Sequence, residues 1–161
     1  MKALQKTIGY QFQNEELLKN ALTHSSYAHE HKHPEWCNER LEFLGDSVLS
    51  IVVSDYLFHN YPTTPEGELT RIRAASVCEK ALFGFAKQIR LGDALLLSRG
   101  EQNTGGRNRP SILADAFEAL IAAIYLDGGM DSAKAFILKY VTPTLDSHRR
   151  GAFKDFKTLL Q

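Results

Sequence analysis

The chain has 161 residues, no formal net charge at pH 7 and 43% hydrophobic residues. These values predict one globular domain that buries a core without disulfide or metal staples. No apolar run has the length of a membrane-crossing helix, and the N-terminus lacks the apolar stretch of a signal peptide. We expect no membrane partner. Because Cys37 and Cys78 form no CxxC motif, we expect reduced thiols in a cytoplasmic protein.

Charge is unevenly distributed along this neutral chain. Residues 30–70 contain eight acids and two lysine or arginine residues, whereas residues 71–109 contain eight such bases and three acids. A zero net charge, taken alone, argues against a nucleic-acid-binding protein. The two blocks indicate either a metal site beside a phosphate-binding surface or an ordinary scatter of solvated charge.

The hydrophobic periodicity is helical almost throughout. Asn14 is the expected N-cap of a first helix that begins at Glu15, and a second helix is expected over residues 23–31. After a loop at Pro34, a long helix is expected over residues 38–59. It is apolar on most sides, which is typical of a helix in the centre of a bundle.

The second half of the chain has the same character. Residues 64–66 (Thr-Pro-Glu) predict an N-cap followed by a first-turn proline and acid, and the helical pattern continues to about Arg90 with a break expected near Ser76. Residues 98–110 are rich in glycine and bases and predict a loop. The remaining predictions are a buried helix over 111–126, stopped by two glycines, and helices near 131–141 and 143–149. The predicted fold class is all-α.

Two carboxylates interrupt the most apolar of these helices. Between Pro110 and Asp127 the only charged residues are Asp115 and Glu118, and their neighbours are large aliphatic and aromatic side chains. An unpaired ionised carboxylate in such surroundings is very costly. Either these two acids face solvent, or a positive group meets them.

The long helix over residues 38–59 carries a similar feature. Glu39, Glu42 and Asp46 are spaced i, i+3 and i+7, so all three project within an arc of about 60°. If the two helices pack together, four or five carboxylates converge, and a divalent cation relieves their repulsion. Oxygen ligands alone favour Mg²⁺ or Mn²⁺ over Zn²⁺.

Solvated acids paired with arginines are the alternative interpretation of these stripes. The candidate partners are Arg71, Arg73, Arg107 and Arg109. Each stripe alone favours that interpretation, whereas both together, on the two most apolar helices, favour a metal site.

Other candidate sites are weaker. Four histidines at positions 24, 29, 31 and 33 lie close together, but Cys37 is the only nearby sulfur and no tetrahedral zinc set is evident. Ser25 and Ser26 adjoin His24, but sequence neighbours rarely form a nucleophile and base pair. Residues 105–107 (Gly-Gly-Arg) are not a P-loop, because no GK[ST] follows.

Four residue strings resemble those of a known family. Residues 38–47 (Asn-Glu-Arg-Leu-Glu-Phe-Leu-Gly-Asp-Ser) closely resemble the signature of ribonuclease III. Residues 22–27 (Leu-Thr-His-Ser-Ser-Tyr), 111–119 (Ser-Ile-Leu-Ala-Asp-Ala-Phe-Glu-Ala) and 124–129 resemble further strings of that family, in matching order and spacing. Over nearly its whole length the chain is therefore similar to the catalytic domain of bacterial ribonuclease III, a helical bundle.

The resemblance implies roles for individual residues. The residues that match the family's four metal-site acids are Glu42, Asp46, Asp115 and Glu118, of which Asp46 and Glu118 match the two catalytic ones. Glu39 and Glu66 match supporting acids of the same cleft. Phe43 matches an apolar residue that inserts into the partner subunit of a homodimer.

The resemblance also implies an activity. Family members hydrolyse double-stranded RNA with metal-activated water and Mg²⁺, leave 5′-phosphate and 3′-hydroxyl ends with short 3′ overhangs, and process ribosomal and messenger RNA. Protein side chains need only position the metals and their waters, so acids suffice. A-form RNA is recognised by its shape and by contacts to its backbone. Lysine and arginine residues within 71–109 are therefore the expected phosphate contacts.

One departure from the family concerns the end of the chain. Family enzymes usually continue into a double-stranded-RNA-binding domain, and the last residues of this sequence resemble the linker just before that domain. We expect residues 1–150 to be the catalytic domain and residues 151–161 to be the linker toward an RNA-binding domain that these 161 residues do not contain.

Two other functions remain open at this stage. An all-α, Mg²⁺-dependent nucleoside triphosphate pyrophosphohydrolase also uses acidic helical pairs. A non-catalytic RNA-binding or dimerisation module is the second alternative, although such a module is expected to lose metal-site acids that this chain retains. A di-iron bundle is remote, because it needs two Glu-x-x-His elements.

Overall fold

The computed structural model describes the backbone of residues 1–160 and the side chains of residues 1–148. The elements are α1 (Lys2–Ile8), α2 (Glu15–Ala21), α3 (Ser25–Glu30), η1 (Pro34–Trp36), α4 (Glu39–Asn60), α5 (Glu66–Ser76), α6 (Glu79–Gln88), α7 (Leu91–Ala94), α8 (Arg99–Asn103), η2 (Gly106–Asn108) and α9 (Pro110–Leu160). An isolated bridge between Thr23 and Leu96 is the only β pairing within residues 1–160. The prediction of an all-α fold is confirmed.

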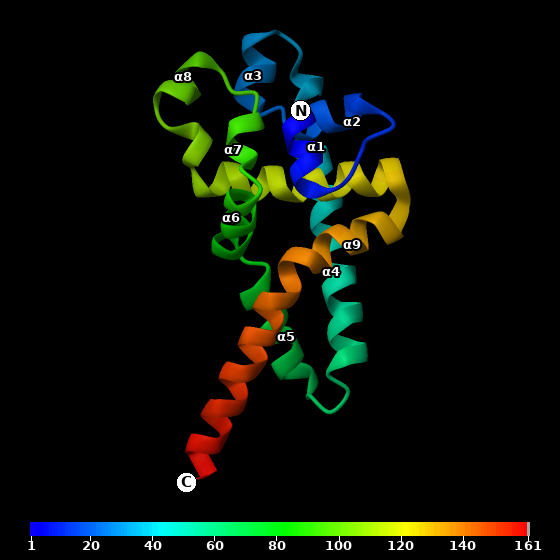
Figure 1. Ribbon diagram of the computed structural model, residues 1–161. Coiled ribbons are helices and arrows are strands. Elements are labelled where there is room, and N and C mark those ends of the chain that lie inside the picture. The colour runs from blue at the N-terminus through cyan, green and yellow to red at the C-terminus, as the bar shows by residue number, and fades with distance from the viewer. Residues whose placement is uncertain (161) are drawn as a thin grey trace.

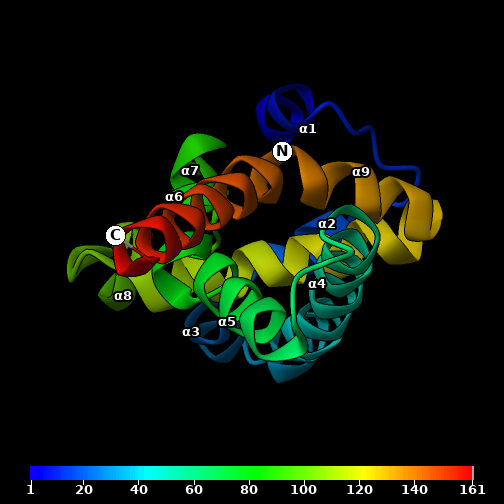
Figure 2. The ribbon, with the colours of Figure 1, turned by 90° about the horizontal axis from the view of Figure 1, so that it is seen from below.

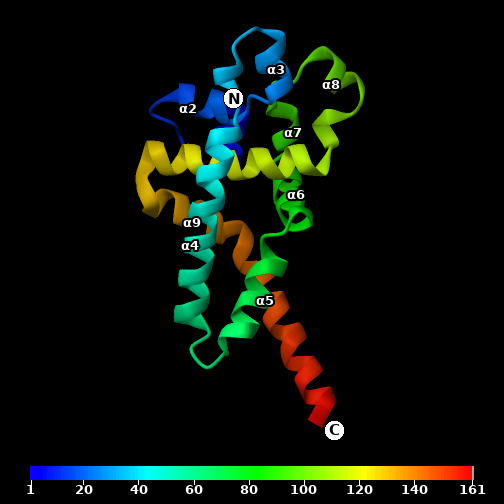
Figure 3. The ribbon, with the colours of Figure 1, turned by 180° about the vertical axis from the view of Figure 1, so that it is seen from behind.

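The first half of α9 forms the centre of the molecule. It crosses α4 and then turns back at Gly129, whose φ of 85° and ψ of 177° interrupt the helix (Figures 1 and 3). Seen from below, this first half runs between α4 and α5 on one side and the returning half of α9 on the other (Figure 2). From Ile112 to Ile124 every residue except Asp115 is buried, as the sequence pattern predicted.

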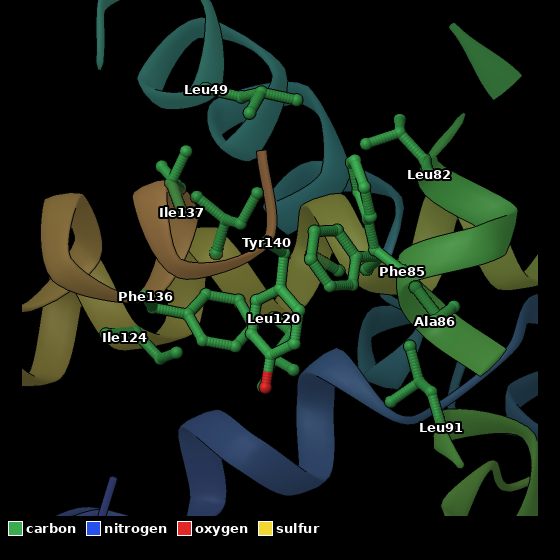
Figure 4. Packing of buried hydrophobic residues seen from close by; sticks show 14 of the residues in the cluster. Leu49, Leu82, Phe85, Ala86, Leu91, Leu120, Ile124, Phe136, Ile137 and Tyr140 are labelled. Carbon is green, nitrogen blue, oxygen red and sulfur yellow. The ribbon is translucent and has the colours of Figure 1, made fainter. Parts of the chain in front are cut away.

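Aromatic side chains connect the central helix to its neighbours. The ring of Phe117, on the first half of α9, lies 5.8 Å from that of Phe85 on α6 and 5.4 Å from that of Phe136 on the returning half. Tyr140, also on the returning half, packs edge-on against the ring of Phe117. It packs in the same way against the ring of Phe136 (Figure 4). Each such buried ring contributes roughly 1.5–3 kcal/mol by removing apolar surface from water.

The N-terminal segment is attached to the bend of α9 through one carboxylate. Asp127 accepts hydrogen bonds from the Tyr10 hydroxyl at 2.7 Å and from the backbone N–H groups of Gln13 and Asn14 at 3.0 and 2.9 Å. The side chain of Asn14 in turn accepts from the N–H of Glu16, so the predicted N-cap is confirmed. These hydrogen bonds hold α2 against the first half of α9.

Helix α1 was not predicted, and it is held to the molecule by two side chains in the hydrophobic core. Leu4 and Ile8 are buried one turn apart, and Gly9, with a φ of 71°, ends the helix in the left-handed conformation. A helix of seven residues has too little periodicity to stand out, because most of its stability comes from packing.

Three predicted boundaries were wrong. Pro65 rather than Thr64 caps α5, without a side-chain bond. The predicted loop at 98–110 contains α8 and η2, because the Ser98 hydroxyl accepts from the N–H of Glu101 and starts a helical turn. Pro143 does not separate two helices but lies inside α9, where buried residues before and after it keep the helix packed against the core.

Helix α9 extends beyond the body of the molecule to Leu160 (Figure 1). The predicted linker, residues 151–161, lies outside the residues whose side chains the structure describes. Within residues 1–160 we find no helical stretch with the length and hydropathy that crossing a bilayer requires.

Candidate metal centre

Two helices cross where the acids lie. Among the described elements, α4 and α9 pack against each other most extensively, and Gly45 lies at their crossing. A Cβ built on Gly45 would lie 1.8 Å from the carbonyl oxygen of Glu118, so glycine alone permits this approach of the two backbones. The crossing brings the stripe of α4 with Glu42 and Asp46 toward Asp115 and Glu118 of α9.

The carboxylates meet at this crossing. Oxygen atoms of Glu42, Asp115 and Glu118 lie within 4.8 Å of one another. Glu118 is only 7% exposed, Glu42 is half-buried, and Asp115 faces solvent. Asp46 follows Glu42 by one turn of α4, and its negative charge acts on Glu118. Three of the four acids expected from the sequence to bind metal therefore lie close together, and the fourth, Asp46, lies one turn of α4 beyond Glu42.

Burial and crowding alter the protonation of these acids. Burial, followed by the hydrogen bond and charge of Asp46, raises the pKa of Glu118 to about 9. Burial and then the charge of Asp115 raise the pKa of Glu42. Burial and then the charge of Glu79 raise the pKa of Asp115. Without a cation, Glu118 thus holds a proton at pH 7, and a divalent cation would displace it.

The arginines considered as alternative partners of the acids bond elsewhere. Within residues 1–148, no ion pair joins an acid of this cluster to lysine or arginine. The arginines contact Glu68 (Arg71), Ser54 (Arg73), the carbonyls of Gly92 and Leu95 (Arg107), and Glu101 (Arg109). What remains is a set of oxygen donors without a fixed cation, which suits a hard ion such as Mg²⁺ or Mn²⁺.

Three further acids differ in their relation to the cluster. Glu39 precedes Glu42 by one turn of α4, and its charge contributes to raising the pKa of Glu42. Glu66 begins α5, where it accepts from the Thr70 hydroxyl at 2.9 Å, and no contact within residues 1–148 joins it to the cluster. Glu79 was missed because it lies on α6 and approaches Asp115 only through packing of α6 on α9.

An apolar side chain projects beside this centre. Phe43 of α4 is 77% exposed, one residue after Glu42. It borders a cavity of about 600 Å³ that is lined by residues of α2, η1 and α4 together with Leu126 of α9. A large exposed ring next to an apolar-walled cavity is typical of a protein interface.

The fold and the acid cluster together define an all-helical domain with a candidate divalent-metal centre. A family model described as Ribonuclease-III-like matches residues 14–145. Ribonuclease 3 of Bacillus cytotoxicus is 51% identical over 99% of this chain, which spans 66% of that protein's length. The nuclease domain of ribonuclease III from Campylobacter jejuni, described with a flexible region involved in dimer formation, superposes with a TM-score of 0.83 at 43% identity, covering 89% of this chain and 96% of that one.

A more distant structure has the same fold. Dicer from Giardia intestinalis superposes with a TM-score of 0.68 at 25% identity, covering 89% of this chain and 19% of its own. The chain belongs to the ribonuclease III family, so the family predicted from the sequence is confirmed.

Proposed function

We propose that the chain is the nuclease domain of a ribonuclease III that cleaves double-stranded RNA with Mg²⁺, or with Mn²⁺ as a substitute. The observation that carries this proposal is Glu118. Its carboxyl is buried among other acids, and no lysine or arginine within residues 1–148 pairs with it. Removing one carboxylate from water in such a place is costly unless a cation joins it.

The proposed metal ligands are Glu42, Asp46, Asp115 and Glu118, with Asp46 and Glu118 catalytic and Glu39 and Glu66 in supporting positions. A bound divalent cation would activate water and offset the charge that develops on the phosphate. The chain's own part is positioning. Because the ligands lie on α4 and α9, which are fixed against each other at Gly45, the site is assembled without movement of a loop.

Duplex RNA is the proposed substrate. The exposed side of the cluster, at Asp115 and Asp46, is open to a phosphate, while Glu118 lies behind it. Proposed products carry 5′-phosphate and 3′-hydroxyl ends with short 3′ overhangs, and the proposed role is processing of ribosomal and messenger RNA. Arg107 is an unsuitable phosphate contact because its Nη1 donates to two backbone carbonyls and its Nη2 to the side chain of Gln102.

The proposed assembly is a homodimer formed around Phe43. Inserting this exposed ring into the adjacent cavity of a second copy would bury it, and the two-fold arrangement would satisfy both rings at once. Support also comes from the related domain of C. jejuni, whose description names dimer formation.

The same proposal assigns the rest of the chain. Residues 1–150 are the nuclease domain, and residues 151–161 are the linker toward an RNA-binding domain. Cys37 and Cys78 are free thiols, which supports a reducing, cytoplasmic location.

A substrate comparison tests the proposal. The chain is incubated at low salt with a long RNA duplex, a single-stranded RNA and a nucleoside triphosphate, each with Mg²⁺ or with EDTA. We expect Mg²⁺-dependent fragments with 5′-phosphates from the duplex alone. Hydrolysis of the triphosphate without cleavage of the duplex would instead identify a pyrophosphohydrolase, and binding of the duplex without cleavage of any substrate would identify a non-catalytic module.

A further inference from the structure

The ring of His24 is held in one orientation. His24 caps α3, and its Nδ1 accepts from the backbone N–H of Ser26 at 3.2 Å and lies 2.7 Å from the Ser26 hydroxyl. An accepting Nδ1 carries no proton, so the proton of the neutral ring is on Nε2. Within residues 1–148, no hydrogen bond is formed by Nε2.

The residues around His24 serve to fix it. The Ser26 hydroxyl accepts from the N–H of Ser98, and the N–H of His24 donates to the carbonyl of Leu96 at 3.0 Å. On the other side, the N–H of Asn38, at the start of α4, donates to the carbonyl of Thr23 at 2.9 Å. The string at residues 22–27 therefore connects the start of α4, which carries the acids, to a rigidly placed imidazole.

Charged groups from several elements influence this imidazole. Asp115 of α9, Glu39 of α4 and Arg109, which directly precedes α9, all act on it electrostatically. Burial and then the charge of Arg109 lower the pKa of His24, so the ring is neutral at pH 7. A neutral donor can remain beside divalent cations, whereas a protonated ring would be repelled by them. The ring forms no hydrogen bond with Asp115 or Glu39 within residues 1–148, so its donor is not used to orient an acid.

We propose that the Nε2–H of His24 donates a hydrogen bond to a backbone oxygen of the RNA strand, next to the metal centre. The inference rests on the proposed function, since it requires an RNA substrate. Half or more of the hydrogen bonds in protein–nucleic acid complexes go to phosphate and sugar oxygens. A donor that the fold already fixes loses little conformational entropy on binding, so it contributes more than a mobile lysine would.

The test uses variants that separate the two ring nitrogens. His24→Asn keeps an oxygen that can cap α3 in place of Nδ1 but has no donor at the position of Nε2. His24→Gln carries its amide further out, near that position. His29→Asn, on the exposed side of the same helix, is the matched control. The measurements are kcat/KM on a short RNA duplex with Mg²⁺ at low salt, and the thermal midpoint Tm.

For His24→Asn we expect kcat/KM to fall roughly 10- to 100-fold, the effect of losing one hydrogen bond to a charged group. Its Tm should stay within about 2 °C of wild type. His24→Gln should recover part of the loss, and His29→Asn should equal wild type. If a single 2′-deoxy substitution at the cleaved nucleotide removes the difference between wild type and His24→Asn, the acceptor is the 2′-hydroxyl. An unchanged difference assigns it to the phosphate.

Two results would overturn the inference while the proposed function stands. One is wild-type kcat/KM for His24→Asn. The other is a loss of activity that is matched by a large drop in Tm, since this would show a structural role alone. A wild-type chain that leaves the duplex intact would overturn the proposed function together with this inference.

Discussion

Replacing Gly45 with alanine should separate the two helices that carry the acids. The new Cβ would lie 1.8 Å from the Glu118 carbonyl oxygen, whereas a carbon and an oxygen in ordinary contact are about 3.3–3.6 Å apart. The backbones must therefore separate by roughly 1.5 Å, since no side chain can rotate to relieve a clash with a carbonyl. Metal ligands tolerate displacements of only about 0.2 Å, so we expect divalent-ion affinity to fall at least about 10-fold.

Gly45→Ala should also lower the free energy of unfolding. Overpacking of this kind costs about 1–3 kcal/mol, and the better helix propensity of alanine offsets up to about 1 kcal/mol. A net loss of about 1–2 kcal/mol lowers the Tm by roughly 2–8 °C in a chain of this size. Gly84 of α6 is the control, because a Cβ there meets no atom within 4 Å and alanine should stabilise the chain slightly. Tm measured by circular dichroism and Mn²⁺ affinity measured by calorimetry provide the assay. Wild-type values of both for Gly45→Ala would refute the reasoning.

Three further variants test contacts at the acid cluster, at the exposed ring of Phe43 and at the bend of α9. Glu118→Gln should abolish Mn²⁺ binding and RNA cleavage, yet raise the Tm of the metal-free chain by about 2–6 °C. The reason is that the pKa of Glu118 is about 9 in the folded chain, against 4.5 for an ordinary glutamate, so the metal-free wild type loses stability as the pH rises from about 5 to 9. The glutamine amide does not ionise, so the variant lacks this loss. Equal pH profiles of Tm for the two proteins would contradict this explanation. Phe43→Ala should be a folded monomer by light scattering at concentrations where wild type is dimeric, whereas an unchanged mass would exclude Phe43 as the interface anchor. Tyr10→Phe removes the hydrogen bond to Asp127 and should cost about 1 kcal/mol in a urea titration, and no change would show that this bond contributes nothing.

The carboxylates of the site were predictable from the sequence because they break an apolar pattern. Asp115 and Glu118 are the only charged residues from Ile112 to Ile124, where every residue except Asp115 is buried, and burying a charge such as Glu118 is costly enough to require an explanation. The spacing of Glu42 and Asp46 on α4 carried the same signal. Local periodicity also predicted the two central helices, since each has enough turns for the pattern to be clear.

Features that depend on tertiary packing were not predictable. Glu79 reaches the cluster only because α6 packs on α9, and no spacing within α6 marks it. Gly45 has an ordinary helical conformation, so its role is visible only when Glu118 is seen against it. His24 stood out weakly as one of four histidines, whereas its fixed orientation depends on Ser98, 74 residues further along the chain.

The central claim is that acids of α4 and α9 form one site for a divalent cation. Diffraction from crystals soaked in Mn²⁺, recorded at the manganese absorption edge, tests it most directly. We expect an anomalous peak at the crossing, within about 2.0–2.3 Å of carboxylate oxygens from Glu42, Asp115 and Glu118. Peaks elsewhere on the protein with none at this crossing would contradict the account.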